Sequence, residues 1–213
     1  VIAVDNLSGG ELENIPTWIP ASVHLLKFHQ VDLTDYEATA EIFISQRPEI
    51  VYHLASCARE GASTLQPVKI CQTNMMASMN VIELGIKYGM QRLVFTSSMS
   101  VYGNGQHKPP FHENMKPQPV DPYGQNKAAI EAIIGQLAEV HKFEYVILRP
   151  HNVYGERASL TDLYRNVISI FCQRIRREES LDIFGKNFNS EFSYMGDCVE
   201  PMVKAAFSDK GIG

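Results

Sequence analysis

The sequence lacks the features that mark several large classes of protein. No apolar run approaches the roughly 20 residues that a membrane-spanning helix needs, and no signal-peptide pattern is visible. The net charge of −5 provides no positive excess for binding nucleic acid or an anionic membrane. The four cysteines form no C-x-x-C pair, so neither a metal site nor a disulfide framework is expected.

The composition is otherwise that of an ordinary globular protein. Apolar residues make up 45% and charged residues 20%, and 213 residues suffice to bury a full core in one or two domains. Cysteines without partners are expected to be reduced, as they are in the cytoplasm. We therefore expect a cytoplasmic protein that binds no metal, no nucleic acid and no membrane.

The stretch between positions 92 and 127 carries the strongest chemical signal. It opens with an apolar run, typical of a buried strand, that ends in three hydroxyl residues, the last of which is Ser98. After a proline-rich loop it closes with Tyr123 and Lys127, four residues apart at the start of a helical pattern. Residues with this spacing lie on one face of a helix, so we expect the phenol and the ammonium to point into the same space.

Ser98, Tyr123 and Lys127 are the predicted catalytic residues because their chemistry is complementary. A phenol has a reference pKa of about 10, and a neighbouring ammonium should lower it. The serine hydroxyl can hydrogen-bond the same substrate oxygen. Together the three groups can remove a proton from an alcohol while a hydride leaves its carbon, which requires a nicotinamide cofactor.

Three motifs extend this reading to nearly the whole chain. They are Thr96–Gly103 (TSSMSVYG), Pro122–Lys127 (PYGQNK) and Arg149–Gly155 (RPHNVYG). In order and spacing the chain resembles the extended short-chain dehydrogenase/reductase family, in its NAD-dependent epimerase/dehydratase group, and most of all the UDP-glucose 4-epimerase branch. The resemblance implies an α/β fold, a doubly wound parallel sheet of the Rossmann type, with a partial C-terminal substrate domain and a homodimer as the assembly.

The resemblance also implies which residues bind the cofactor. Asp5 ends the first apolar run, where a carboxylate accepts hydrogen bonds from ribose hydroxyls and disfavours a 2′-phosphate, so NAD is expected rather than NADP. A turn or helix-capping aspartate is the alternative. The implied cofactor-binding residues are Asp5, Asn6, Leu7, Ser8, Asp32, Leu33, Leu54, Ala55, Ser56, Thr73, Ser97, Tyr123, Lys127, Pro150 and His151.

On the substrate side the resemblance implies a nucleotide sugar, with a UDP-sugar favoured. The family usually has an arginine at the position of Ser190 and an aspartate at that of Gly196, and losing a bidentate arginine removes a strong diphosphate contact. The basic residues at 174, 176 and 177 either form a solvated helix face or take over that contact. The implied substrate-binding residues are Ser98, Tyr123, Asn152, Asn166, Leu181, Ile183 and Phe184.

The residues after Ser98 narrow the choice of reaction. Related dehydratases carry an acidic pair there, whereas this chain has Met99 and Ser100, which have no acid–base capacity. This argues against dehydration and leaves three hypotheses: a 4-epimerase that consumes no net NAD, a net oxidoreductase with the same trio, and a non-catalytic nucleotide-binding protein. The intact trio counts against the third.

No glycine-rich G-x-x-G-x-x-G stretch appears, although a dinucleotide fold normally has one after its first strand. We therefore expect a fragment that lacks the first strand, the first helix and the C-terminal end. Residues 1–155 would form the NAD-binding domain and 156–213 the start of the substrate domain, with about 192–207 returning to pack on the first. Expected strands are 1–4, 24–31, 50–55, 92–98 and 145–149, and expected helices are 36–45, 67–88 and 123–141.

Overall fold

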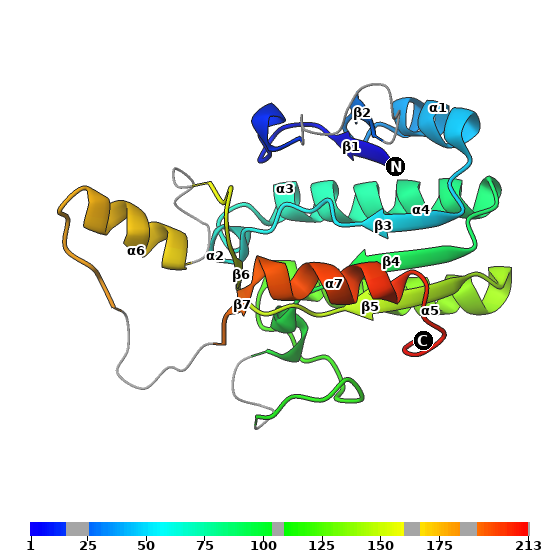
Figure 1. Cartoon of the computed structure of the whole chain (residues 1–213). Helices are drawn as coiled ribbons and strands as arrows, with labels where there is room; N and C mark the ends of the chain where they lie inside the picture. Colours follow the sequence, from blue (N-terminus) through cyan, green and yellow to red (C-terminus); the bar gives the residue numbers. More distant parts are fainter. Residues whose placement is uncertain (16–25, 104–108, 160–166, 184–190, 213) are drawn as a thin grey trace.

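The computed structural model describes residues 1–15, 26–103, 109–159, 167–183 and 191–212 (Figure 1). Its strands form three parallel ladders, in which β1 pairs with β2, β4 lies between β3 and β5, and β6 pairs with β7. The expected α/β fold with parallel strands is confirmed. The strands are β1 (Ile2–Asp5), β2 (Lys27–Gln30), β3 (Ile50–His53), β4 (Arg92–Thr96), β5 (Glu144–Leu148), β6 (Val153–Tyr154) and β7 (Ser193–Tyr194).

The helices follow the chain order expected of an alternating β/α sequence. They are α1 (Tyr36–Gln46), α2 (Glu60–Ser63), α3 (Pro67–Cys71), α4 (Ala77–Lys87), α5 (Pro122–His141), α6 (Val167–Arg176) and α7 (Met195–Ala205). None of the helices within these described ranges is long and apolar enough to cross a membrane.

Strand β4 is the centre of the core because both of its faces are covered. Leu93 and Phe95 point to one face and pack in a cluster with Ile82 of α4 and Ile130 of α5. Val94 points to the opposite face, where it packs in a cluster with residues from the end of α7. Side chains alternate across a strand, so an uninterrupted apolar run is what a strand covered on both faces requires.

Helix α5 begins at Pro122, one residue before the predicted start at Tyr123. Asp121 is its N-cap, and the carboxylate accepts a hydrogen bond of 2.9 Å from the backbone N–H of Gly124. Pro122 occupies the first helical position, where a missing N–H is harmless. The helix ends at Lys142, which takes a left-handed φ of 60°. The position of this N-terminus fixes the direction in which the Tyr123 side chain points.

The helix expected over 67–88 contains an irregularity that the sequence did not predict. A π-helical turn, Gln72–Met76, joins α3 to α4 and inserts an extra residue into the helical spacing. Asn74 lies in this turn with only 2% of its surface exposed. The turn therefore aims a polar side chain inward from a helix that is otherwise regular.

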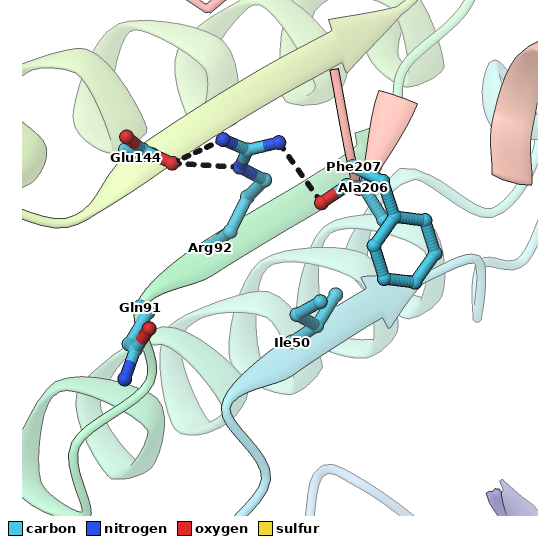
Figure 2. A pocket seen from close by; sticks show the side chains of 6 residues that line it. All are labelled: Ile50, Gln91, Arg92, Glu144, Ala206 and Phe207. Carbon is cyan, nitrogen blue, oxygen red and sulfur yellow. Dashed lines mark hydrogen bonds and ion pairs between the residues drawn. The ribbon is translucent and has the colours of Figure 1, made fainter. Parts of the chain in front are cut away.

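The C-terminal helix α7 runs along β4 and β5 and is fastened at their amino ends (Figure 1). The guanidinium of Arg92 donates two hydrogen bonds to the carboxylate of Glu144 and one each to the carbonyls of Ala206, at 2.9 Å, and Ser208, at 3.0 Å. Figure 2 shows this group beside a cavity of about 200 Å³. The cavity is lined by Ile50, Gln91, Arg92, Glu144, Ala206 and Phe207.

Candidate active site

The predicted catalytic residues converge beyond the carboxyl ends of β3, β4 and β5. Ser98 follows β4, while Tyr123 and Lys127 come from the first turns of α5, which packs across the strands. Open parallel sheets bind their ligands at this edge, because loops from neighbouring strands meet there. The convergence of these side chains around one phenol makes this edge the candidate active site.

The phenol of Tyr123 is buried, with 7% of the residue exposed. Burial, with the carboxylates of Glu60 and Asp121, raises the pKa of Tyr123 to about 12, although hydrogen bonds with the Ser98 and Ser56 hydroxyls act to lower it. The pKa of Tyr123 is therefore raised, and not low as the sequence predicted. The physical reason is that loss of solvent and two nearby carboxylates outweigh the groups that favour the phenolate.

Lys127 is almost fully enclosed, with 2% of its surface exposed. Its ammonium donates a 2.7 Å hydrogen bond to the carbonyl of Thr96 and lies 4.8 Å from the ring centroid of Phe95 and 5.8 Å from that of Tyr123. Burial lowers the pKa of Lys127 to about 7, and Glu131 partly offsets this by raising it. The lysine charge at neutral pH therefore depends on its surroundings.

Ser98 is held by the turn that follows β4. Its hydroxyl oxygen accepts a 3.1 Å hydrogen bond from the backbone N–H of Ser100 and so caps a short 3-10 turn, Met99–Tyr102. Helix α5 packs closely on this turn. A Cβ added to Gly124 would lie only 2.9 Å from the carbonyl oxygen of Ser100. A side chain at Gly124 would therefore push Tyr123 away from Ser98.

Ser56 and Asn74 connect the loop after β3 to the phenol of Tyr123. The side-chain oxygen of Asn74 accepts hydrogen bonds from the backbone N–H of Cys57, at 2.7 Å, and from the hydroxyl of Ser56, at 3.2 Å. These contacts hold the loop after β3 so that Ser56 reaches Tyr123. Ser56 was assigned to the cofactor from the resemblance alone, and no spacing in the sequence indicates the π-helical turn that aims Asn74.

The residues predicted at the adenosine end lie together after β1 and β2. The carboxylate of Asp5 accepts a 2.6 Å hydrogen bond from the backbone N–H of Leu7, and the amide of Asn6 donates one of 2.9 Å to Asp32. Hydrogen bonds from Thr34 and Asn6 lower the pKa of Asp32, so its carboxylate stays charged. Beside them, Leu33 packs against α1 and α4, and Ser8 donates its N–H to Asn6.

The residues predicted at the nicotinamide end include polar atoms that nothing satisfies in the described part of the chain. The hydroxyl of Ser97 and the Nδ1 atom of His151 are buried there without a hydrogen-bond partner. Leu54 is 52% exposed, Ala55 is also exposed, and Thr73 lies half-buried in the π-helical turn. The carbonyl of Pro150 accepts the N–H of Met99. Unpaired buried donors and acceptors beside small residues fit a bound dinucleotide.

The predicted substrate residues are less closely grouped. The amide of Asn152, which has a φ of 25°, donates a 2.9 Å hydrogen bond to the carbonyl of Glu191. Leu181 and Ile183 are exposed on the segment after α6, apart from β3–β5 (Figure 1). The structure thus does not bring these two side chains to the catalytic trio. Two further predicted residues, Asn166 and Phe184, lie outside the described residues.

The departures from the family pattern have a partial explanation. Ser190 lies outside the described residues, but Gly196 opens α7 against the ring of Tyr194. A Cβ at this glycine would lie 2.5 Å from that ring, whose hydroxyl donates a 2.7 Å bond to Glu156. An aspartate would therefore have to displace Tyr194. In the basic cluster, Arg174 is already paired with Asp182 at 2.5 Å, as a solvated helix face would be.

Two further observations concern a buried histidine and the grouping of metal-binding side chains. His53 is 3% exposed, hydrogen-bonds with the hydroxyl of Ser78 at 2.9 Å and stacks on Phe95, so it is a packed core residue. Burial lowers the pKa of His53 to about 3, so the ring is neutral. Across the described ranges, no three His, Cys, Asp or Glu side chains are grouped in a way that could hold a metal ion.

Comparison with known proteins assigns the family. The model of the NAD dependent epimerase/dehydratase family matches residues 1–211. A putative UDP-glucose 4-epimerase of Methanocaldococcus jannaschii is 33% identical over 207 residues, which cover 96% of this chain and 65% of the relative. The chain thus spans less than two thirds of that protein's length.

Solved structures agree with this comparison. The UDP-glucose 4-epimerase of Thermotoga maritima with UDP-glucose is 32% identical, with a TM-score of 0.90 over 100% of this chain and 66% of that one. The Thermus thermophilus UDP-glucose 4-epimerase in complex with NAD is 30% identical, with a TM-score of 0.86 over 98% of this chain and 67% of that one. The chain belongs to the NAD dependent epimerase/dehydratase family.

Proposed function

We propose that the protein is an NAD-dependent sugar-nucleotide 4-epimerase. It would oxidise the sugar 4-hydroxyl to a 4-keto intermediate and reduce this ketone on its opposite face. The observation that carries the proposal is the convergence of Ser98, Tyr123 and Lys127 beyond the strand ends. The similar proteins are named UDP-glucose 4-epimerases, and one was solved with UDP-glucose, which supports a UDP-sugar as the substrate.

Each residue of the trio has one task in this reaction. Tyr123 takes the proton of the 4-hydroxyl as a phenolate during oxidation, and as a phenol it returns this proton to the same oxygen during reduction. Ser98 hydrogen-bonds that oxygen and keeps it beside the phenol. Lys127 favours the charged form of the phenol when it carries its own proton. NAD, when bound, accepts the hydride and gives it back, so the cycle consumes no net cofactor.

The raised pKa of Tyr123 supports the second half of this cycle. A phenol with a pKa of about 12 is protonated at neutral pH and is ready to donate to the ketone oxygen. The turn after Ser98 supports the choice of epimerisation over dehydration. It carries Met99 and the buried Ser100, and neither can expel water from a neighbouring carbon as an acid–base pair would.

The residues at the adenosine end would hold NAD through the carboxylate of Asp5. A carboxylate there accepts hydrogen bonds from the ribose hydroxyls and repels a 2′-phosphate. Asp5→Ala should therefore narrow the preference for NAD over NADP by about tenfold or more, as about 1.4 kcal/mol of lost discrimination would give. Calorimetry with both cofactors measures this, and equal affinity in the unvaried protein would contradict the assignment.

The activity is tested with protein made from the complete reading frame. It is incubated with NAD and, separately, with UDP-glucose, UDP-N-acetylglucosamine, UDP-glucuronate, GDP-glucose and dTDP-glucose. NMR of the product sugar should show inversion at C4 with at least one UDP-sugar and no build-up of NADH absorbance. Inversion at another carbon, or no reaction with any of these sugars, would contradict the proposal.

A net oxidoreductase is the second candidate, since the same trio serves a reaction that releases its keto product. This chain has Ser190 where the family usually has an arginine and Gly196 where it usually has an aspartate. These differences favour a substrate other than the usual one. The two functions differ in one observable quantity. An oxidoreductase accumulates NADH in proportion to product, whereas an epimerase reaches equilibrium between two sugars with NADH absorbance unchanged.

Location and assembly complete the proposal. The four cysteines are free, and reduced thiols suit the cytoplasm. We propose a cytoplasmic homodimer, which cell fractionation and analytical ultracentrifugation of the complete protein would test. A monomer at micromolar concentration would contradict the dimer.

A further inference from the structure

Helix α5 presents a third ionisable side chain in line with Tyr123 and Lys127. Glu131 follows Lys127 by four residues, so the three groups occupy one face of the helix. Glu131 is 8% exposed and lies about two turns further along the helix than Tyr123. The catalytic trio accounts for two of the three groups and leaves the buried carboxylate without a task.

An arginine at the end of β5 fixes the position of Glu131. The guanidinium of Arg149 donates two hydrogen bonds to the Glu131 carboxylate, of 3.0 Å from Nε and 2.6 Å from Nη2. The side chain of Arg149 is 16% exposed and that of Glu131 is 7% exposed. A planar guanidinium that holds both oxygens of a carboxylate leaves it little freedom to rotate.

The groups around Lys127 show why the charge of Glu131 affects the protonation of this lysine. Facing the ammonium are His53 from β3, which is neutral, the carbonyl of Thr96 from β4, and the neutral phenol of Tyr123. Burial of Lys127 opposes its positive charge, and within the described part of the chain Glu131 is the group that opposes this effect. Without that carboxylate, the remaining positive charge of Arg149 would add to the penalty.

We propose that Glu131, held by Arg149, is a positioning residue that favours the protonated form of Lys127 beside Tyr123. The proposal rests on the function proposed above, because a charged Lys127 matters only if Tyr123 exchanges a proton. It assigns to Glu131 an electrostatic role that acts through another residue. It does not require Glu131 to touch the substrate or the cofactor.

The same ion pair reaches the loop in front of the site. Arg149 donates a further hydrogen bond of 3.0 Å to the hydroxyl of Tyr102 and one of 3.3 Å to the carbonyl of Glu113. The ring of Tyr102 stacks on Phe111 at 4.9 Å, and Phe111 stacks on His151 at 6.3 Å between ring centroids. The position of Glu131 is thus anchored by β5 and by the loop, and not by its own helix alone.

The direct test measures the pKa of Lys127 by NMR of lysine labelled at Cε, in protein made from the complete reading frame. The Lys127 signal is identified by its loss in Lys127→Met. Glu131→Gln should lower the pKa of Lys127 by about one unit or more, because an opposite charge at close range shifts a pKa by about 1–3 units. Glu131→Asp keeps the charge and should stay within a few tenths of a unit.

Two controls separate this role from a merely structural one. Glu144→Gln makes the same chemical change in the ion pair with Arg92 at the opposite end of the sheet and should leave the pKa of Lys127 unchanged. If Glu131→Gln does not fold, the double variant Glu131→Leu/Arg149→Met replaces the pair with apolar side chains, which buried ion pairs often tolerate. It should lower the pKa of Lys127 in the same direction but by less, because the positive charge of Arg149 is removed together with the carboxylate.

The activity arm measures kcat against pH. Lys127 loses its proton at lower pH in Glu131→Gln, so the alkaline decline of kcat should move to lower pH by the same amount. If the protein has no epimerase activity, the proposed function fails while the NMR shift still tests the inference. An unchanged pKa of Lys127 in Glu131→Gln, or in the double variant, would overturn the inference even in a fully active enzyme.

Discussion

The two ends of the central strands carry the same ion pair in different surroundings. At the amino end, Arg92 pairs with Glu144 and binds the carbonyl of Ala206 (Figure 2). It also binds the carbonyl of Ser208. At the carboxyl end, Arg149 pairs with Glu131 on the helix that carries the buried Lys127. The chemistry of the two pairs is alike, so the neighbours decide what each pair does. One fastens a helix, and the other lies where a buried charge depends on it.

The two ends also differ in how fully their polar atoms are satisfied. At the amino end, Arg92 donates to a carboxylate and two carbonyls. At the carboxyl end, the hydroxyls of Thr96, Ser97 and Ser100 are buried without partners in the described part of the chain. Unpaired buried groups lower stability, and sites of binding or catalysis are where proteins retain them. The contrast predicts that substitutions at one end change activity and those at the other change stability.

The largest effect is expected at the carboxyl end, from Tyr123→Phe. The change removes the hydroxyl that carries the proton and keeps the buried ring, so kcat should fall by about 10²–10⁴-fold. Affinity for NAD and thermal stability should change little. Tyr52→Phe is the matched control, because it removes a phenol whose hydroxyl bonds to the carbonyl of Val203. Near-normal turnover in Tyr123→Phe would end the proposed mechanism.

Lys127→Met should separate activity from stability. Turnover and NAD affinity should both fall, while the melting temperature should rise by several degrees because a buried charge is replaced by an apolar side chain. The folded pKa of about 7 lies below the unfolded value of 10.5, so the unvaried protein should gain unfolding free energy as pH rises between these values.

In Lys127→Met this gain with rising pH should be absent, which chemical denaturation at several pH values measures. Lys69→Met changes an exposed lysine on α3 and serves as the control, with both properties unaltered. A variant that lost both activity and stability would show that Lys127 supports the fold, against the comparison drawn here.

A smaller effect is expected from the two serines that reach the phenol. Ser98→Ala and Ser56→Ala each remove one hydroxyl that lowers the pKa of Tyr123, so each should raise that pKa and reduce kcat by about tenfold, in line with about 1 kcal/mol per hydrogen bond. Measuring kcat in both variants and in Ser45→Ala, which changes an exposed serine of α1, tests this. A loss in Ser98→Ala equal to that in Tyr123→Phe would contradict the assigned roles.

The smallest effect on activity is expected at the amino end. Arg92→Met removes the contacts to Glu144, Ala206 and Ser208, which should lower the free energy of unfolding by about 1–3 kcal/mol. Turnover of the folded protein should stay within about twofold, a change of about 0.4 kcal/mol. Chemical denaturation and kcat at saturating substrate measure the two quantities. A large fall in kcat would show that the two ends are coupled.

Most of the fold could be predicted from hydrophobic patterns and caps. The strand over Arg92–Thr96 and the helix from Tyr123 to His141 are confirmed because their signals are local: an apolar run in one case and a cap with an N-terminal proline in the other. The meeting of Ser98 with Tyr123 could also be predicted, because parallel strands place their carboxyl ends at one edge.

The electrostatics of the site could not be predicted, because they depend on groups distant in sequence. The pKa of Tyr123 is raised by burial and by Glu60, which the sequence places 63 positions away (123 − 60). Glu131 carried a usable signal, since it repeats the four-residue spacing from Tyr123 to Lys127. Its partner Arg149 carried none, because nothing in a linear pattern indicates which buried cation a carboxylate will meet.

The length of helix α7 fixes the distance between the two ends of the sheet. Its 11 residues span about 16 Å at 1.5 Å per residue. One end follows β7, which pairs with β6 just beyond Asn152, and the other is held where Arg92 binds the carbonyl of Ala206. Adding or removing one residue would move β7 by about 1.5 Å and turn it by about 100°. The position of β6 and β7 therefore depends on the contact between Arg92 and Ala206 at the other end of α7.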